Sequence, residues 1–98
     1  MKNFVTYQLA LELYKECAVL KAEYYLRDQL CRASLSIVLN ISEGAAKQSP
    51  KDRKRFYGIA FASLKETQTL IDILAAPTLA NKADKLGAFL YKLMVNTR

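Results

Sequence analysis

Apolar residues recur every three or four positions along nearly the whole chain, which is the spacing that places side chains on one face of an α-helix. Four such segments are separated by short breaks, and no stretch alternates with the two-residue period of a half-buried β-strand. The pattern predicts an all-α protein. We expect a single domain over residues 1–98, folded as an antiparallel up-and-down four-helix bundle.

The first and fourth predicted helices form the two ends of this series. The first starts after Asn3, a residue type that caps helices, and continues to about Lys21 or Tyr24. The fourth has Thr78 or Asn81 as its cap. Their apolar positions keep steps of three and four: Val5, Leu9, Leu13, Cys17 and Leu20 in the first helix, and Leu79, Ala83, Leu86, Leu90 and Leu93 in the fourth.

The second predicted helix begins near Leu26 or Asp28 and carries a wide apolar arc. At about 100° per residue, its apolar side chains spread over about 200°, which is more than one flank of a small bundle covers. Such a helix is either central in the fold, or packs one face inside its own subunit and another against a neighbour. A polar stripe fills a sector of about 80°. Its members are Gln29, Arg32, Ser36, Asn40, Glu43 and Lys47.

The third predicted helix has the clearest start. Ser49 is a suitable N-cap, Pro50 suits the first helical position, and Asp52 lies three residues after the cap. The helix runs to about Ala75 and is ended by Pro77. Because only a few residues separate it from the second helix, we expect the two helices to form an antiparallel hairpin.

Composition narrows the chemistry available to this bundle. The chain has 98 residues, 52% of them hydrophobic, which suits one folded domain and argues against disorder. It has no histidine, which is the commonest general base and metal ligand, and no Gly-rich phosphate loop. Cys17 and Cys31 lack metal-ligand spacing, and we expect inert buried thiols rather than a disulfide. We therefore expect a protein that is not an enzyme and uses no cofactor or metal.

We expect neither a membrane-spanning segment nor a secretory leader. No apolar run approaches the roughly 18–20 residues that a membrane span needs. The N-terminal stretch MKNFVTYQLALELYKEC carries Glu12 and Glu16 and no small-residue cleavage signal, unlike a secretory leader. We expect a cytoplasmic protein that does not enter a membrane.

Positive charge is concentrated between the second and third helices. The chain carries 15 Lys and Arg against 9 Asp and Glu, a formal charge of +6, which favours an anionic partner such as nucleic acid. Positive charge opposes the dipole at a helix start, so its placement there has a small local cost. A solvated helix start is the alternative to a functional patch. We predict a nucleic-acid-binding site in the stretch KQSPKDRKRFY, at Lys47, Lys51, Arg53, Lys54 and Arg55.

Two stretches carry a resemblance to a known family. The first, DQLCRASLSIVLNISEG, spans residues 28–44, and the second, KRFYGIAFASLKETQTLID, spans residues 54–72. They contain a Ser-Ile-x-x-Asn-Ile-x-Glu-Gly box and an Arg-Phe-x-x-Ile-Ala-x-x-Ser-Leu-x-Glu stretch. With these motifs the chain resembles the bacterial four-helix-bundle proteins named after intervening sequences in 23S ribosomal RNA. The accessory variability determinants of diversity-generating retroelements belong to the same broad group.

The resemblance implies a ring-shaped homopentamer with a central channel, a basic surface and an accessory role without catalysis. In retroelements, such a protein partners the reverse transcriptase and binds RNA. The tryptophan common in the first helix of the family has no counterpart here. Two functions stay open: an RNA-binding accessory protein with a reverse transcriptase as candidate partner, and an oligomeric protein–protein scaffold that does not bind nucleic acid.

The polar stripe of the second helix also permits two interpretations. In the structural one, residues three or four apart interact and fix helix register or a subunit contact. The other is direct ligand binding by Asn40 and Glu43. Because buried amides and charges need partners, we favour the structural interpretation. It predicts that Arg32, Ser36, Asn40, Glu43 and Gly44 specify assembly.

Overall fold

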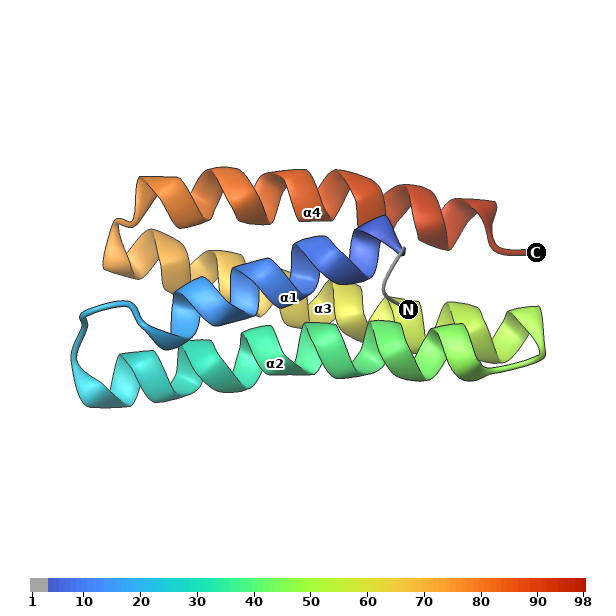
Figure 1. The fold of residues 1–98 in the computed structure, drawn as a ribbon, viewed down its shortest axis with the longest axis horizontal. Coiled ribbons are helices and arrows are strands. Elements are labelled where there is room, and N and C mark those ends of the chain that lie inside the picture. Colours follow the sequence, from blue (N-terminus) through green and yellow to red (C-terminus); the bar gives the residue numbers. More distant parts are fainter. Residues whose placement is uncertain (1–3) are drawn as a thin grey trace.

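Four helices make up the fold in a computed structural model that describes residues 4–98 (Figure 1). They are α1 (Val5–Ala18), α2 (Tyr24–Ala46), α3 (Pro50–Leu74) and α4 (Pro77–Asn96). Each helix packs against its neighbour in the chain, and α4 closes the bundle against α1. The prediction of an antiparallel up-and-down four-helix bundle is therefore confirmed. The molecule measures 41 × 22 × 21 Å along its principal axes.

The break between α1 and α2 differs from the prediction. Helix α1 ends at Ala18 instead of continuing to Lys21 or Tyr24, and α2 begins earlier than predicted, at Tyr24. Leu20 still packs against the core from the non-helical link, so the apolar spacing persists after the helix has stopped. Periodicity alone therefore overestimated the length of α1. The proposed cap Asn3 lies outside the described residues.

The start of α3 confirms one predicted boundary, and the turn between α3 and α4 corrects another. The Ser49 hydroxyl accepts a hydrogen bond from the Asp52 backbone N–H at 3.0 Å, as predicted for the start of α3. Ala75 follows α3 with a left-handed φ of 52°. Helix α4 then starts at Pro77, before the predicted caps Thr78 and Asn81, because proline suits the first helical position.

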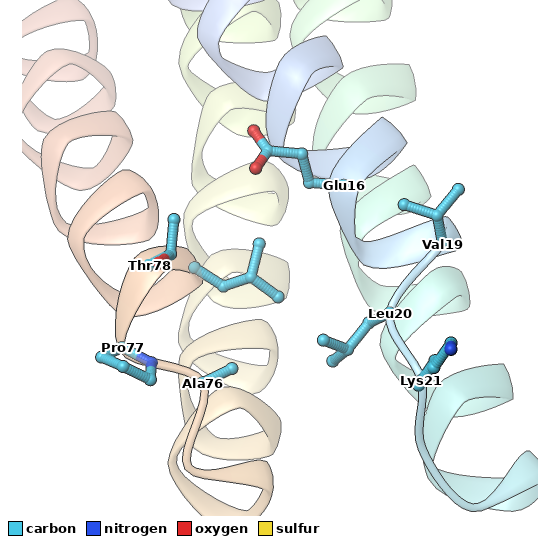
Figure 2. A pocket seen from close by; sticks show the side chains of 8 residues that line it. Glu16, Val19, Leu20, Lys21, Ala76, Pro77 and Thr78 are labelled. Carbon is cyan, nitrogen blue, oxygen red and sulfur yellow. The ribbon is translucent and has the colours of Figure 1, made fainter.

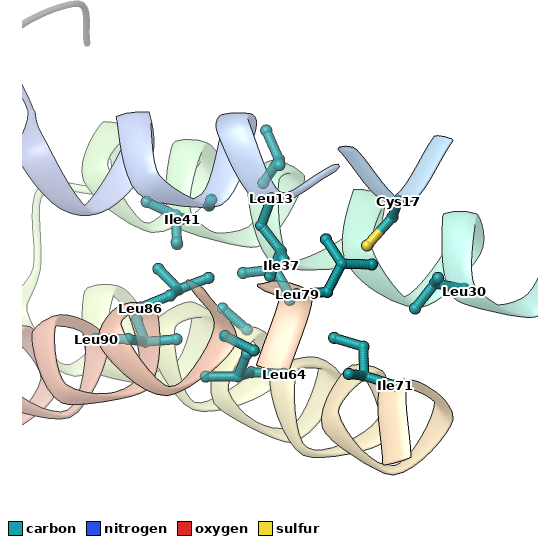
Figure 3. Close-up of a cluster of buried hydrophobic side chains, with 14 of the residues drawn as sticks. Leu13, Cys17, Leu30, Ile37, Ile41, Leu64, Ile71, Leu79, Leu86 and Leu90 are labelled. Carbon is teal, nitrogen blue, oxygen red and sulfur yellow. The ribbon is translucent and has the colours of Figure 1, made fainter. Parts of the chain in front are cut away.

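The core runs along the bundle axis and receives side chains from all four helices (Figure 3). Helix α2 contributes Leu30, Ile37 and Ile41, which are fully buried. Its Leu35 and Leu39 stay exposed, so the apolar arc of α2 is wider than the core of one chain can cover. Helix α2 contacts α1 and α3 and is not central in the fold. None of the helices in residues 4–98 is long and apolar enough to cross a membrane.

Candidate nucleic-acid interface

The predicted basic site lies at one end of the bundle, where α2 turns into α3 (Figure 1). We call residues 47–55 the basic junction. Gly44 allows the two helices to come close just before it: a Cβ added there would lie 2.7 Å from Cε1 of the buried Tyr57 ring. Burial raises the pKa of the Tyr57 phenol, and the nearby Arg53 charge partly opposes this shift. The close contact between Gly44 and Tyr57 therefore brings α2 and α3 together just before the basic junction.

Arg53 makes hydrogen bonds to the link between α2 and α3, residues 47–49. Its Nη1 donates hydrogen bonds to the carbonyl oxygens of Lys47 at 3.2 Å and Gln48 at 2.6 Å. Both residues follow Ala46, the last residue of α2, so their carbonyl oxygens have no hydrogen-bond partner within that helix. Arg53 is half-buried and part of its hydrogen-bonding capacity is used inside the chain. The structure therefore gives it a structural contact that the sequence did not reveal.

Lys47 and Arg55 surround a single aromatic side chain. The Lys47 ammonium lies 5.1 Å and the Arg55 guanidinium 4.6 Å from the centre of the Phe56 ring, distances typical of cation–π contacts. Lys47 also approaches the Glu43 carboxylate at 3.9 Å, which is a weak, partly exposed ion pair. Lys47 therefore has a carboxylate partner, whereas Arg55 is exposed and meets no carboxylate among the described residues.

Lys51 and Lys54 are the least restrained cations of the junction. Both are exposed, and neither forms an ion pair or a side-chain hydrogen bond within residues 4–98. The backbone at the start of α3 offers little to an anion. Pro50 has no N–H, and the Asp52 and Arg53 amides already donate to Ser49. The available positive charge of the junction is therefore carried by side chains.

The predicted polar stripe divides into two kinds of contact. Arg32 pairs with Asp28 at 3.0 Å and Glu43 with Lys47, both on the surface one turn apart. The Ser36 hydroxyl instead hydrogen-bonds the Ser63 hydroxyl of α3 at 2.7 Å.

Asn40 supports this link between helices. Its Nδ2 donates to the Ser36 carbonyl oxygen at 2.8 Å and to the Ser36 hydroxyl at 3.1 Å. Thr67 donates to the Ser63 carbonyl oxygen at 2.8 Å, which continues the polar contact along α3. Ser63 was not predicted as a partner. Ser36 lies 10 residues before the end of α2 and Ser63 lies 13 residues after the start of α3, so an antiparallel hairpin places them within about one helical turn of each other. This spacing alone does not single out the pair.

The two cysteines lie in different environments. Cys17 is buried, as predicted, and burial raises the pKa of its thiol to about 11. Cys31 is only half-buried, which corrects the prediction that both thiols are buried. Within residues 4–98, no three or more Cys, Asp or Glu side chains gather in a way that could hold a metal ion.

Sequence comparison places a family model over almost the whole of this bundle. The model describes the 23S rRNA-intervening sequence protein and matches residues 3–92, which include the basic junction, the Ser36–Asn40 contacts and most of α4. A comparison with curated proteins found no match.

Proposed function

The chain belongs to the family of 23S rRNA-intervening sequence proteins, and we propose that it is a non-enzymatic accessory protein that binds RNA through the basic junction. The observation that carries this proposal is the cluster of Lys51, Lys54 and Arg55, which are exposed and meet no carboxylate among residues 4–98. Phosphate groups attract such side chains whatever the base sequence. RNA is proposed over DNA because the family is named after a ribosomal RNA insertion.

A second part of the proposal is self-association through the outer face of α2 and α3. Leu35 and Leu39 of α2 and Ile59 of α3 are exposed by 37%, 57% and 40%. The Oδ1 of Asn40 accepts no hydrogen bond from residues 4–98 and is not fully buried, so it is free to meet a neighbouring subunit. Apolar patches on helices favour association, and a polar residue beside them can set its register.

We propose a ring-shaped homopentamer, the assembly that the family resemblance implies. Five copies of a chain with a formal charge of +6 would carry +30 and would present the basic junction five times. Several weak phosphate contacts on one rigid ring then combine into useful affinity. The proposal places the protein in the cytoplasm and includes a retroelement reverse transcriptase as a candidate partner.

An oligomeric scaffold without RNA binding is the second candidate function. The exposed apolar face of α2 and α3 favours it, since this face would serve protein contacts whether or not the basic junction binds phosphate. In that case the positive charge would serve solubility or an acidic protein partner. The two functions differ in what the purified oligomer does with RNA.

The test is the affinity of the purified protein for a fluorescent structured RNA across a salt series, with the oligomer mass measured in the same buffers. The variant is Lys51→Ala/Lys54→Ala, and Arg53 is kept because it holds the link. The matched control Lys15→Ala/Lys21→Ala removes the same charge from exposed positions in and after α1.

We expect the junction variant to bind more weakly and to depend less on salt. Each lost phosphate contact should lower the slope of log affinity against log salt by about 0.7–0.9. Two contacts per engaged subunit give a change of roughly 1.5. Equal losses in both double variants would mean that net charge, not the junction, binds RNA. No binding by an intact oligomer at low salt would remove the RNA mechanism and leave the scaffold.

A further inference from the structure

The net positive charge of the chain lies on the first part of α3 and the last part of α4. Residues 51–65 and 88–98 hold seven basic residues and one acidic residue, a formal charge of +6, which equals that of the whole chain. The remaining residues hold eight of each sign. None of the seven basic residues forms an ion pair within residues 4–98. Two of them, Lys92 and Arg98, lie outside the basic junction, so the positive surface extends from the junction onto α4.

These two basic segments lie side by side at the same end of the bundle (Figure 1). The Phe61 ring of α3 meets the Tyr91 ring of α4, with ring centres 6.5 Å apart and ring planes tilted by 53°. About one turn further along, a Cβ added at Gly87 of α4 would lie 3.3 Å from Cδ2 of Leu64 in α3. The close packing of α3 against α4 therefore joins basic residues that are distant in the chain into one surface.

The aromatic pair gives this surface an exposed ring. Tyr91 is 58% exposed, whereas Phe61 is half-buried and packs against the core. The Lys65 ammonium lies 4.9 Å from the centre of the Phe61 ring, and Lys92, the neighbour of Tyr91 in the chain, is exposed. Proteins bind single-stranded nucleic acid with such a combination, because a base stacks on the aromatic ring while the cations hold the backbone phosphates.

An open strip of α3 connects the basic junction with this ring. Lys54, Gly58, Phe61 and Lys65 are spaced by three or four residues, so they share one face of the helix. No atom of another residue among 4–98 would contact a Cβ added at Gly58 within 4 Å. The strip is therefore uncovered at Gly58, and its Lys54 and Phe61 lie about 10 Å apart along the helix axis.

We propose that Tyr91 is a stacking platform for an unpaired base of single-stranded RNA. Phe61 holds the Tyr91 ring in place, and Lys65 and Lys92 bind the phosphates on either side of the stacked base. This inference rests on the proposed RNA binding at the basic junction and specifies the form of RNA that is bound, a single-stranded segment that crosses from the junction to α4. A base within a duplex has no free face for the ring, so a duplex would use the cations alone.

Self-association through the outer face of α2 and α3 is compatible with this site. Ile59 precedes Phe61 by two residues and therefore lies about 200° from it around α3. An interface that contains Ile59 uses the opposite side of α3 from the aromatic pair.

The groove at the other end of the bundle does not suit RNA (Figure 2). Its volume is about 330 Å³, and Figure 2 shows Leu20, Ala76 and Pro77 around it. Its Glu16 carboxylate pairs with the Lys82 ammonium at 2.7 Å. The residues outside the two basic segments carry no net charge, so no excess of positive charge draws phosphates to this groove.

The experiment measures the affinity of the full-length protein for two RNA strands by fluorescence anisotropy at low salt. One strand is single-stranded without self-complementarity, and the other is an abasic strand with the same number of phosphates. We expect wild type to bind the strand with bases more tightly. Tyr91→Ala should lower the affinity for that strand at least about five-fold, as expected for loss of a stacked base, and should change the affinity for the abasic strand less than about two-fold.

Two further variants serve as controls. Tyr91→Phe keeps the ring and should bind both strands within about two-fold of wild type. Tyr25→Ala removes a tyrosine that is 64% exposed at the start of α2, at the other end of the bundle, and should also stay within about two-fold. Because Tyr91 and Tyr25 are exposed, we expect the alanine variants to fold, and unchanged circular dichroism would show it.

Several outcomes would overturn the stacking proposal. Equal affinity of wild type for the two strands would do so, as would an equal loss on both strands in Tyr91→Ala, even if Lys51→Ala/Lys54→Ala still weakens the binding of structured RNA. A changed oligomer mass in Tyr91→Ala would also overturn it, because a subunit contact would then cover the ring. No binding to either strand or to structured RNA would remove the proposed RNA binding together with this inference.

Discussion

Replacement of Gly44 by alanine tests the close approach of α2 and α3. The new Cβ would lie 2.7 Å and 2.9 Å from two atoms of the Tyr57 ring and 3.2 Å from Cβ of Phe56. Tyr57 is only 3% exposed, so its ring cannot move into solvent without opening the core. Such overpacking costs about 1–3 kcal/mol, while alanine gains about 1 kcal/mol of helix propensity over glycine. The net expectation is a loss of up to about 2 kcal/mol of unfolding free energy.

Gly58→Ala is the matched control for this prediction. Gly58 also lies within a helix, but nothing lies within 4 Å of an added Cβ there. It should gain about 0.5–1 kcal/mol. The propensity gain is shared by both variants, so their difference of about 1–3 kcal/mol isolates the steric cost. Each kcal/mol corresponds to about 4–8 °C in Tm for a domain of this size.

The assay is urea unfolding followed by circular dichroism, with all variants at one protein concentration because association would shift the midpoint. In a Tyr57→Leu background the cost of Gly44→Ala should shrink, because the ring that blocks the Cβ is gone. If Gly44→Ala is as stable as Gly58→Ala, the two helices do not approach closely at Gly44 and the reasoning is wrong.

Three further predictions concern contacts elsewhere in the bundle. Lys82 of α4 hydrogen-bonds Glu12 of α1 and also pairs with Glu16 of α1. The Lys82 charge lowers the pKa of Glu12 from its usual value, and the two carboxylates raise the pKa of Lys82 from its usual value. The Tm advantage of wild type over Lys82→Met should therefore be constant near neutral pH. It should decrease as Glu12 is protonated at low pH or as Lys82 loses its proton at high pH; a difference independent of pH would refute this prediction. A thiol reagent should label Cys31 in the native protein and Cys17 only after unfolding, since burial raises the pKa of the Cys17 thiol to about 11; equal rates would contradict this. Asn40→Leu should change the mass or homogeneity of the oligomer in analytical ultracentrifugation, and an unchanged assembly would count against a role of this residue in association.

The helices themselves were largely predictable because their signals are local. Apolar spacing placed four helices in order, and the Ser49–Pro50–Asp52 pattern located the start of α3 correctly. The end of α1 was not predictable in this way, because Leu20 keeps the apolar spacing while the backbone has left the helix. Whether a residue at an apolar position is helical depends on where the chain must turn, and the turn depends on the other helices.

The sequence by itself determined the charge and composition of the candidate site, and the tertiary structure decided which residues are available. Five basic residues near the link were evident from the sequence, but only the structure separates Arg53, which bonds the link carbonyls, from the exposed Lys51 and Lys54. The Ser36–Ser63 hydrogen bond likewise joins segments that are distant in the chain. So do the exposed side chains of Val19, Tyr24 and Ile73, which lie at the end of the bundle opposite the basic junction. The physical reason is that helix formation depends on neighbours within one turn, whereas side-chain partners depend on the register of helices packed against each other.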